Sequence, residues 1–262
     1  MQPRSIPSDI HYMRAMIVNL LMIGEASQGQ WTLIDTGIPG FADRIAHAAK
    51  QRFGTEKPSS IILTHGHFDH VGSLKALLTR WEDVPVYAHR LELPFLQGDA
   101  DYLPADPTVG GGLMAELAPL YPHKGIDLGG RVEALPEDGS VPTLPEWTVI
   151  ETPGHTDGHI ALFRERDRTI IAGDAFITVK QESALAVLLQ QEEIHGPPTY
   201  FTPNWDAAGD SVRRLAALLP EVAITGHGKP VTGQALIEGL DQLAQHFEEK
   251  AIPEHGRYVV QS

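Results

Sequence analysis

The strongest signal in the chain is the segment Thr64-His65-Gly66-His67-Phe68-Asp69-His70, in which three histidines and one aspartate fall within six residues. It directly follows residues 59–63, a short apolar run that is typical of a strand buried on both faces. Burying these polar side chains without partners would cost several kcal/mol, so the segment does not belong to an apolar core. We interpret it as a turn of metal ligands, with a solvated polar turn as the alternative.

Three further potential ligands occupy the same kind of position, each just after an apolar, strand-like run. His155 follows residues 147–151, Asp174 follows 168–172, and His227 follows 221–225. A single histidine after a strand is more often a hydrogen-bonded residue at the rim of a sheet. Their recurrence favours one shared site, because functional residues of α/β proteins gather at the carboxyl ends of strands.

The rest of the chain alternates strands with helices, which is the pattern of an α/β fold. We expect strands over 13–24, 31–35, 59–63, 84–88, 147–151, 159–163, 168–172 and 221–225. We expect helices over 41–53, 71–81, 185–191, 206–219 and 231–249. The proline-rich region 89–130 is predicted to be an irregular or short-helical insertion that forms a lid, a substrate wall or a solvated spacer. No linker is visible, so we expect a single domain over 1–262.

Composition excludes several classes of protein. The formal charge of −14 over 262 residues repels phosphate backbones, so we expect no nucleic-acid partner. Cysteine is absent, which rules out disulfides, thiolate ligands and a catalytic thiol, and makes the cytoplasm the simplest location. A transition metal would therefore need imidazole and carboxylate ligands. The early apolar stretch 15–23 is shorter than the roughly 20 residues that span a bilayer, so we expect no membrane segment.

The order of these motifs resembles that of the metallo-β-lactamase superfamily. The matching motifs are HxHxDH, then Pro153-Gly154-His155, Gly173-Asp174 and Gly226-His227-Gly228, with Asp35 in an early Asp-Thr-Gly motif. The resemblance covers about 17–230, almost the whole chain. It implies an α/β fold, a four-layer αββα sandwich of two mixed β-sheets with helices outside, and a site for two metal ions.

The resemblance also implies which residues bind the metals. His65, His67 and His155 would bind one ion. Asp69, His70 and His227 would bind the second, and Asp174 would bridge the two. Two divalent ions are expected, most simply Zn²⁺, although Mn²⁺ and Fe²⁺ also suit histidine and carboxylate ligands.

Two further residues are candidates for supporting the ligands. Asp35 would hydrogen-bond the ligand turn or orient an imidazole, and the alternative is that it caps its own turn. His159 would brace the site from a neighbouring strand, or is a hydrogen-bonded histidine of the core. The loop 195–205, which carries His195 and Tyr200, is a candidate entrance for substrate.

The implied activity is hydrolysis of a small ester, lactone or thioester by a hydroxide that bridges the metals, with Asp69 as a candidate proton carrier. The presence of both the Asp69-His70 pair and Asp174 disfavours β-lactam hydrolysis. Only 35 residues follow His227, too few for the C-terminal region of glyoxalase II-like thioesterases, and Ile177 stands where lactonases commonly have tyrosine.

Two alternatives remain open. One is a mononuclear-iron sulfur dioxygenase that uses only His65, His155 and Asp174, and the other is a non-catalytic scaffold. The expected partner is a small-molecule substrate, and the sequence leaves the oligomeric state open.

Overall fold

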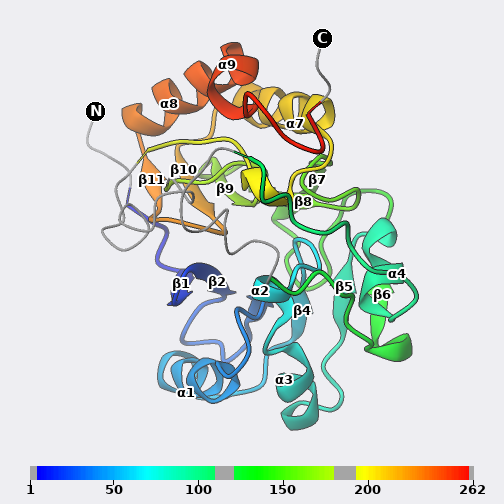
Figure 1. Cartoon of the computed structure of the whole chain (residues 1–262). Coiled ribbons are helices and arrows are strands. Elements are labelled where there is room, and N and C mark those ends of the chain that lie inside the picture. Colours follow the sequence, from blue (N-terminus) through cyan, green and yellow to red (C-terminus); the bar gives the residue numbers. More distant parts are fainter. Residues whose placement is uncertain (1–4, 110–120, 180–192, 260–262) are drawn as a thin grey trace. The chain divides into compact units, whose positions relative to one another are not determined.

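A computed structural model describes residues 5–109, 121–179 and 193–259, which fold into two compact units (Figure 1). The N-terminal unit contains Pro7–Tyr102 and Lys124–Thr148, and the C-terminal unit contains Leu103–His123 and Val149–Ser262 together with Met1–Ile6. The predicted single domain over 1–262 stays a prediction. The helix expected over 185–191 and the middle of the 89–130 insertion lie outside the described residues.

The N-terminal unit is built on a mixed sheet of six strands. In spatial order these are β1 (Ile10–Ala15), β2 (Val18–Ile23), β3 (Thr32–Ile34), β4 (Ser60–Ile62), β5 (Val86–Ala88) and β6 (Val132–Ala134). Strands β1 to β3 pair antiparallel, and β3 to β6 pair parallel. Helices α1 (Ala42–Phe53) and α3 (Leu74–Arg80) contribute Ile45 and Leu77 to one core with Leu33 and Ile61 of the strands.

The single strand predicted over 13–24 is wrong, because the chain reverses in its middle. Strands β1 and β2 form a hairpin in which Ala15 faces Val18, and the turn between them is Met16 and Ile17. Met16 has a φ of 61° and is 65% exposed. Tight hairpin turns require such left-handed residues, but they are usually glycine, asparagine or aspartate. Methionine gives no turn signal, so the end of β1 and the fully buried β2 read as one apolar run.

The second sheet is also mixed and has five strands. In spatial order these are β11 (Val231–Thr232), β10 (Val222–Thr225), β9 (Thr169–Gly173), β8 (Ile160–Arg164) and β7 (Trp147–Glu151). Strands β9 and β10 are parallel, whereas β8 pairs antiparallel with β9 and β11 with β10. Helices α7 (Trp205–Ala217) and α8 (Gln234–Gln245) share one core with this sheet through Val212 and Leu240, and α9 (Phe247–Ala251) follows them (Figure 1).

The predicted helix over 231–249 is wrong at its start and in its middle. Val231 and Thr232 pair with β10 instead, and the helix breaks at His246, whose φ and ψ are −122° and 36°. The other strands and helices expected on described residues are present within a few residues. Helix α7 begins at Trp205, one residue before the expected start, and the side chain of Asn204 accepts the capping hydrogen bond from the Ala207 amide at 3.1 Å.

The direction of the strands determines where the polar residues lie. Strands β3 and β4 are parallel neighbours, so Asp35 and the turn 64–70 emerge at the same edge of their sheet. Strands β9 and β10 are also parallel neighbours, so Asp174 and His227 emerge together in the other unit. None of the helices among the described residues has the length and apolar character needed to cross a membrane.

Candidate metal centre

The turn after β4 brings four potential ligands of the N-terminal unit together. His67 precedes the short helix α2 (Phe68–Val71), which carries Asp69 and His70 on its first turn. The ligand atoms of His65 lie within 4.8 Å of those of His67 and His70, and those of Asp69 and His70 are equally close. All four residues are largely buried, with exposed fractions of 8% or less for the residue as a whole. The segment thus brings imidazole and carboxylate groups close together within this unit, and their role as metal ligands stays a prediction.

Asp35 fixes the orientation of this turn through three hydrogen bonds. Its Oδ1 accepts from the Thr64 amide at 2.8 Å, and its Oδ2 accepts from the Thr64 hydroxyl at 2.7 Å. The same Oδ2 lies 2.8 Å from Nδ1 of His70. A carboxylate oxygen can only accept here, so Nδ1 of His70 carries the proton and Nε2 keeps its lone pair for a metal. Asp35 itself adopts a φ of 57°, which aspartate tolerates better than most residues.

The tautomer of His65 follows from the same network. The Thr64 hydroxyl donates its only proton to Asp35, so it can only accept from His65 Nδ1, 3.1 Å away. Nδ1 of His65 therefore carries the proton, and Nε2 is available as a ligand. One aspartate and one threonine thus prepare two imidazoles for metal binding.

The C-terminal unit brings together the three remaining predicted ligands. Oδ2 of Asp174 lies 3.2 Å from Nε2 of His227 and 3.5 Å from Nε2 of His155. All three side chains are about 2% exposed. The Thr202 hydroxyl donates to the Pro198 carbonyl at 2.8 Å and so accepts from Nδ1 of His155, 3.3 Å away. Nε2 of His155 therefore faces Asp174 without its proton, as a ligand requires.

His159 supports Asp174 from the neighbouring strand. Its Nε2 accepts a hydrogen bond from the Asp174 amide at 2.9 Å, and its Nδ1 lies 2.7 Å from the hydroxyl of Thr152. The imidazole is 1% exposed and is held from both sides. His159 is thus both a hydrogen-bonded core residue and the group that fixes the backbone of Asp174, so the two interpretations of the sequence describe the same contact.

Gly154 illustrates why a glycine precedes His155. Its φ is 133°, and a Cβ atom there would lie 2.4 Å from the backbone nitrogen of Ala208, in the first turn of α7. The amide of Asn204 donates to the Gly154 carbonyl at 3.3 Å. The loop that carries His155 therefore rests directly on the start of the helix, an approach that only glycine allows.

Two residues that sequence patterns do not single out contact the ligand turn of the N-terminal unit. Oε2 of Glu92, which is fully buried, accepts hydrogen bonds from the Gly66 amide at 2.9 Å and from the Tyr102 hydroxyl. The Tyr102 ring packs against His67 with 4.6 Å between ring centroids. Burial, together with the charge and hydrogen bond of Glu92, raises the pKa of Tyr102 well above its usual value, so its hydroxyl stays protonated. Glu92 and Tyr102 lie in a segment whose sequence reads only as an irregular insertion.

The chemistry of these donors fits transition-metal binding. The N-terminal unit offers His65, His67, His70 and Asp69, and the C-terminal unit offers His155, His227 and Asp174. Neutral imidazole and carboxylate are ligands of zinc, iron and manganese, and thiolate is absent. Partners on the second nitrogen of an imidazole, as found for His65, His70 and His155, are the usual companions of metal-ligating histidines.

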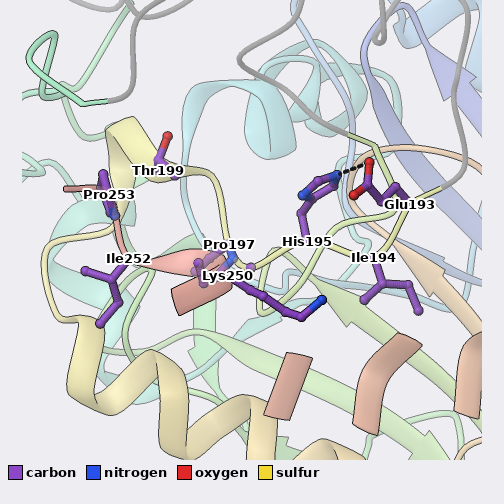
Figure 2. A pocket seen from close by; sticks show the side chains of 10 residues that line it. Glu193, Ile194, His195, Pro197, Thr199, Lys250, Ile252 and Pro253 are labelled. Atoms are coloured by element: carbon purple, nitrogen blue, oxygen red, sulfur yellow. Dashed lines mark ion pairs between the residues drawn. The ribbon is translucent and has the colours of Figure 1, made fainter. Parts of the chain in front are cut away.

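A pocket of about 340 Å³ lies elsewhere in the C-terminal unit. It is lined by residues from two segments, 193–199 and 250–253, and Figure 2 shows His195 beside the carboxylate of Glu193, with Lys250 reaching along the pocket. The His195 Nε2 and Glu193 Oε2 atoms are 3.3 Å apart. The backbone of His195 pairs with Ile177, three residues beyond Asp174. Part of the predicted entrance loop 195–205 therefore lines a pocket, and its role stays a prediction.

Comparison with known proteins now decides the family. The model of the metallo-beta-lactamase superfamily matches residues 13–227. The chain belongs to this superfamily. It is 50% identical over 240 residues to the probable metallo-hydrolase YflN of Bacillus subtilis, covering 91% of this chain and 90% of the relative. These findings make it a metallo-hydrolase with histidine and aspartate ligands, and they confirm the resemblance read from the motifs.

More distant similarities agree with this assignment. The chain is 30% identical over 203 residues to a hydroxyacylglutathione hydrolase of Xanthomonas axonopodis pv. citri, covering 77% of this chain and 58% of that enzyme. The crystal structure of TTHA1623 in a di-iron-bound form is 26% identical, with a TM-score of 0.56, and covers 90% of this chain and 96% of that chain. The B3 metallo-beta-lactamase BLEG-1 shares the fold at 20% identity, with a TM-score of 0.60. The predicted α/β fold with two mixed sheets is confirmed.

Proposed function

We propose that this chain is a binuclear metal-dependent hydrolase that cleaves a small ester, lactone or thioester. The observation that carries the proposal is the set of prepared imidazoles. His65, His70 and His155 each have Nδ1 hydrogen-bonded to an oxygen atom, which leaves Nε2 ready to bind a metal. A protein that merely retained the fold would have no need to keep these protons in place.

The proposed ligand sets are the ones that the family resemblance implies. We propose that His65, His67 and His155 hold one ion. Asp69, His70 and His227 would hold the second, and Asp174 would bind both. When bound, two divalent ions would polarise an acyl carbonyl and lower the pKa of a bound water molecule towards about 7. We propose Zn²⁺ as the native ion, whereas the di-iron-bound form of TTHA1623 makes iron the first competitor.

The protein's own residues would then have separate tasks. Asp35 and Thr64 keep His70 and His65 in the ligating tautomer, and His159 holds the backbone of Asp174. Asp69, which is 8% exposed, would carry a proton to the leaving group. The match to hydroxyacylglutathione hydrolases favours an acyl bond as the substrate.

Metal analysis beside a hydrolysis screen tests this proposal. We expect two zinc ions per chain, together with hydrolysis of activated esters, lactones or thioesters. One iron per chain with oxidation of a persulfide would support the sulfur dioxygenase instead, and no metal would support a scaffold. The cytoplasmic location stays a prediction that these measurements do not address.

A pair of histidine variants tests the assigned ligands. His67→Ala should abolish ester hydrolysis and lower the metal content while the circular dichroism spectrum stays unchanged. His47→Ala is the matched control, because His47 is an exposed residue of α1 in the same unit. Full hydrolysis by His67→Ala after treatment with a chelator would contradict the proposal.

A further inference from the structure

We propose that Tyr102 and Glu92 form a positioning pair that fixes His67 in its metal-ligating orientation, an inference that rests on the proposed function. Neither residue belongs to the ligand set, and both lie in the N-terminal unit with the ligand turn. Their contacts with the turn set the geometry of one ligand and hence the affinity for metal.

Glu92 links the pair to the backbone of the turn. It ends the 3₁₀ helix η1 (Arg90–Glu92) and is fully buried. A single oxygen, Oε2, accepts from the Gly66 amide at 2.9 Å and from the Tyr102 hydroxyl. Oε2 of Glu92 therefore holds both Gly66, which lies between His65 and His67, and Tyr102, whose ring contacts His67.

The ring of Tyr102 limits the movement of the His67 imidazole. It stacks on Phe95 with 4.2 Å between centroids and an angle of 13° between planes. It also packs against the His67 ring, with 4.6 Å between the ring centroids and an angle of 66° between the ring planes. Phe95 stacks on the Tyr102 ring, and Glu92 accepts the hydrogen bond of its hydroxyl. These two contacts restrict rotation of the ring and its movement away from His67. The backbone of His67 is extended, with φ of −63° and ψ of 151°, so side-chain contacts rather than helix geometry decide how the imidazole points.

The glycine at position 66 fits the same explanation. Its φ is not in the left-handed region, so conformation alone does not require glycine there. A Cβ atom would instead lie 2.3 Å from the Tyr102 hydroxyl oxygen, whereas its next contacts, with Leu96 Cδ2 and Tyr102 Cζ, would be 3.0 and 3.3 Å. The middle residue of the His-x-His motif must therefore be small because the tyrosine hydroxyl occupies the adjacent space.

Cobalt binding tests the proposal without relying on catalysis. The metal-free protein is titrated with Co²⁺ against a competing chelator, and the visible absorption of bound Co²⁺ is recorded. Tyr102→Phe removes the hydroxyl, and Tyr102→Leu also removes the ring. We expect the Co²⁺ affinity of the site that contains His67 to fall about tenfold in Tyr102→Phe and about a hundredfold in Tyr102→Leu. The visible absorption spectrum of that site should also change. Losses of this size are typical when a hydrogen-bonding or packing partner of a metal ligand is removed. Tyr12→Phe, at a half-buried residue of β1 in the same unit, is the control and should bind as the wild type does.

The outcomes separate this inference from the proposed function. Failure of the wild type to bind Co²⁺ would refute the proposed function itself. If the wild type binds Co²⁺ and Tyr102→Leu binds it with the same affinity and spectrum, only the positioning role is refuted. A lower melting temperature of the metal-free variant with unchanged affinity would likewise show that the pair serves packing alone.

A second pair of variants tests the steric part of the argument. Gly66→Ala should displace Tyr102 and weaken Co²⁺ binding by about tenfold or more. Adding Tyr102→Phe removes the atom that the new methyl group would strike. The double variant should therefore bind Co²⁺ more tightly than Gly66→Ala alone, although each single change weakens binding. Additive losses would overturn the assignment of Gly66 to this contact.

Discussion

Replacing Asp35 with asparagine substitutes an NH₂ donor for one of the two oxygen acceptors that hold the turn 64–70. The carboxylate accepts from the Thr64 amide, the Thr64 hydroxyl and His70 Nδ1 at 2.7 to 2.8 Å. An amide has one acceptor oxygen, so in either orientation its NH₂ group faces at least one donor. With NH₂ at the Oδ2 position, His70 can regain a hydrogen bond only by moving its proton to Nε2, which then cannot bind a metal.

The size of the effect follows from this change of tautomer. Loss of a hydrogen-bond partner behind a metal ligand typically weakens metal binding about 10- to 100-fold. This corresponds to about 1.4 to 2.7 kcal/mol at 25 °C, since a factor of ten equals roughly 1.4 kcal/mol. Asparagine tolerates the left-handed backbone that Asp35 adopts, with φ of 57°, so backbone strain should add little. The loss should therefore appear mainly in metal affinity.

Chelator competition with Zn²⁺ and metal analysis of the purified protein measure this loss. Asp43→Asn is the matched control, because Asp43 is an aspartate of α1 in the same unit whose side chain is 87% exposed. It should bind Zn²⁺ as the wild type does. Wild-type affinity for both ions in Asp35→Asn would refute the tautomer argument, and with it the role that we assign to Asp35.

Two stability predictions follow from contacts away from the ligands. Burial would raise the pKa of Asp167, but hydrogen bonds and the charge of the buried Arg164, at 2.8 and 3.1 Å, hold the pKa below its usual value. This stabilisation is present above the pKa that Asp167 has in the unfolded chain, and it is lost as the pH falls through its pKa in the folded chain. Asp167→Asn should therefore lower the free energy of unfolding in urea by about 1–3 kcal/mol at pH 7. The difference between the variant and the wild type should shrink in acid. An equal difference at pH 7 and pH 3 would contradict this pairing. Gly154→Ala should lower the unfolding free energy by more than about 2 kcal/mol, because its Cβ would strike Ala208, whereas Gly129→Ala, with a φ of 55° and nothing within 4 Å, should cost only about 1 kcal/mol. Equal melting temperatures of the two glycine variants would show that the loop moves away from the helix freely.

Local pattern was sufficient for most of the secondary structure. The apolar run before Thr64 predicted β4, and the helical spacing after Phe41 predicted α1. Both predictions succeeded because the pattern of buried residues in a strand or helix is set by residues that are close together in the chain. The local pattern failed where the backbone turns or breaks at a residue whose type gives no sign of a turn or a break. Met16 forms a hairpin turn in a left-handed conformation, and His246 interrupts a run that otherwise has helical character.

The side chains that could bind metal can be identified from the amino-acid sequence, since the ligand candidates follow strands and carry imidazole or carboxylate groups. The groups that hydrogen-bond to these candidates become visible only in the folded chain. Glu92 and Thr202 are 26 and 47 residues away from the backbone and imidazole that they bind. Such contacts leave no local period or spacing in the chain, because they arise when the sheets and loops place distant segments side by side. The tautomers of His65, His70 and His155 are therefore a property of the fold, although the imidazoles themselves are a property of the sequence.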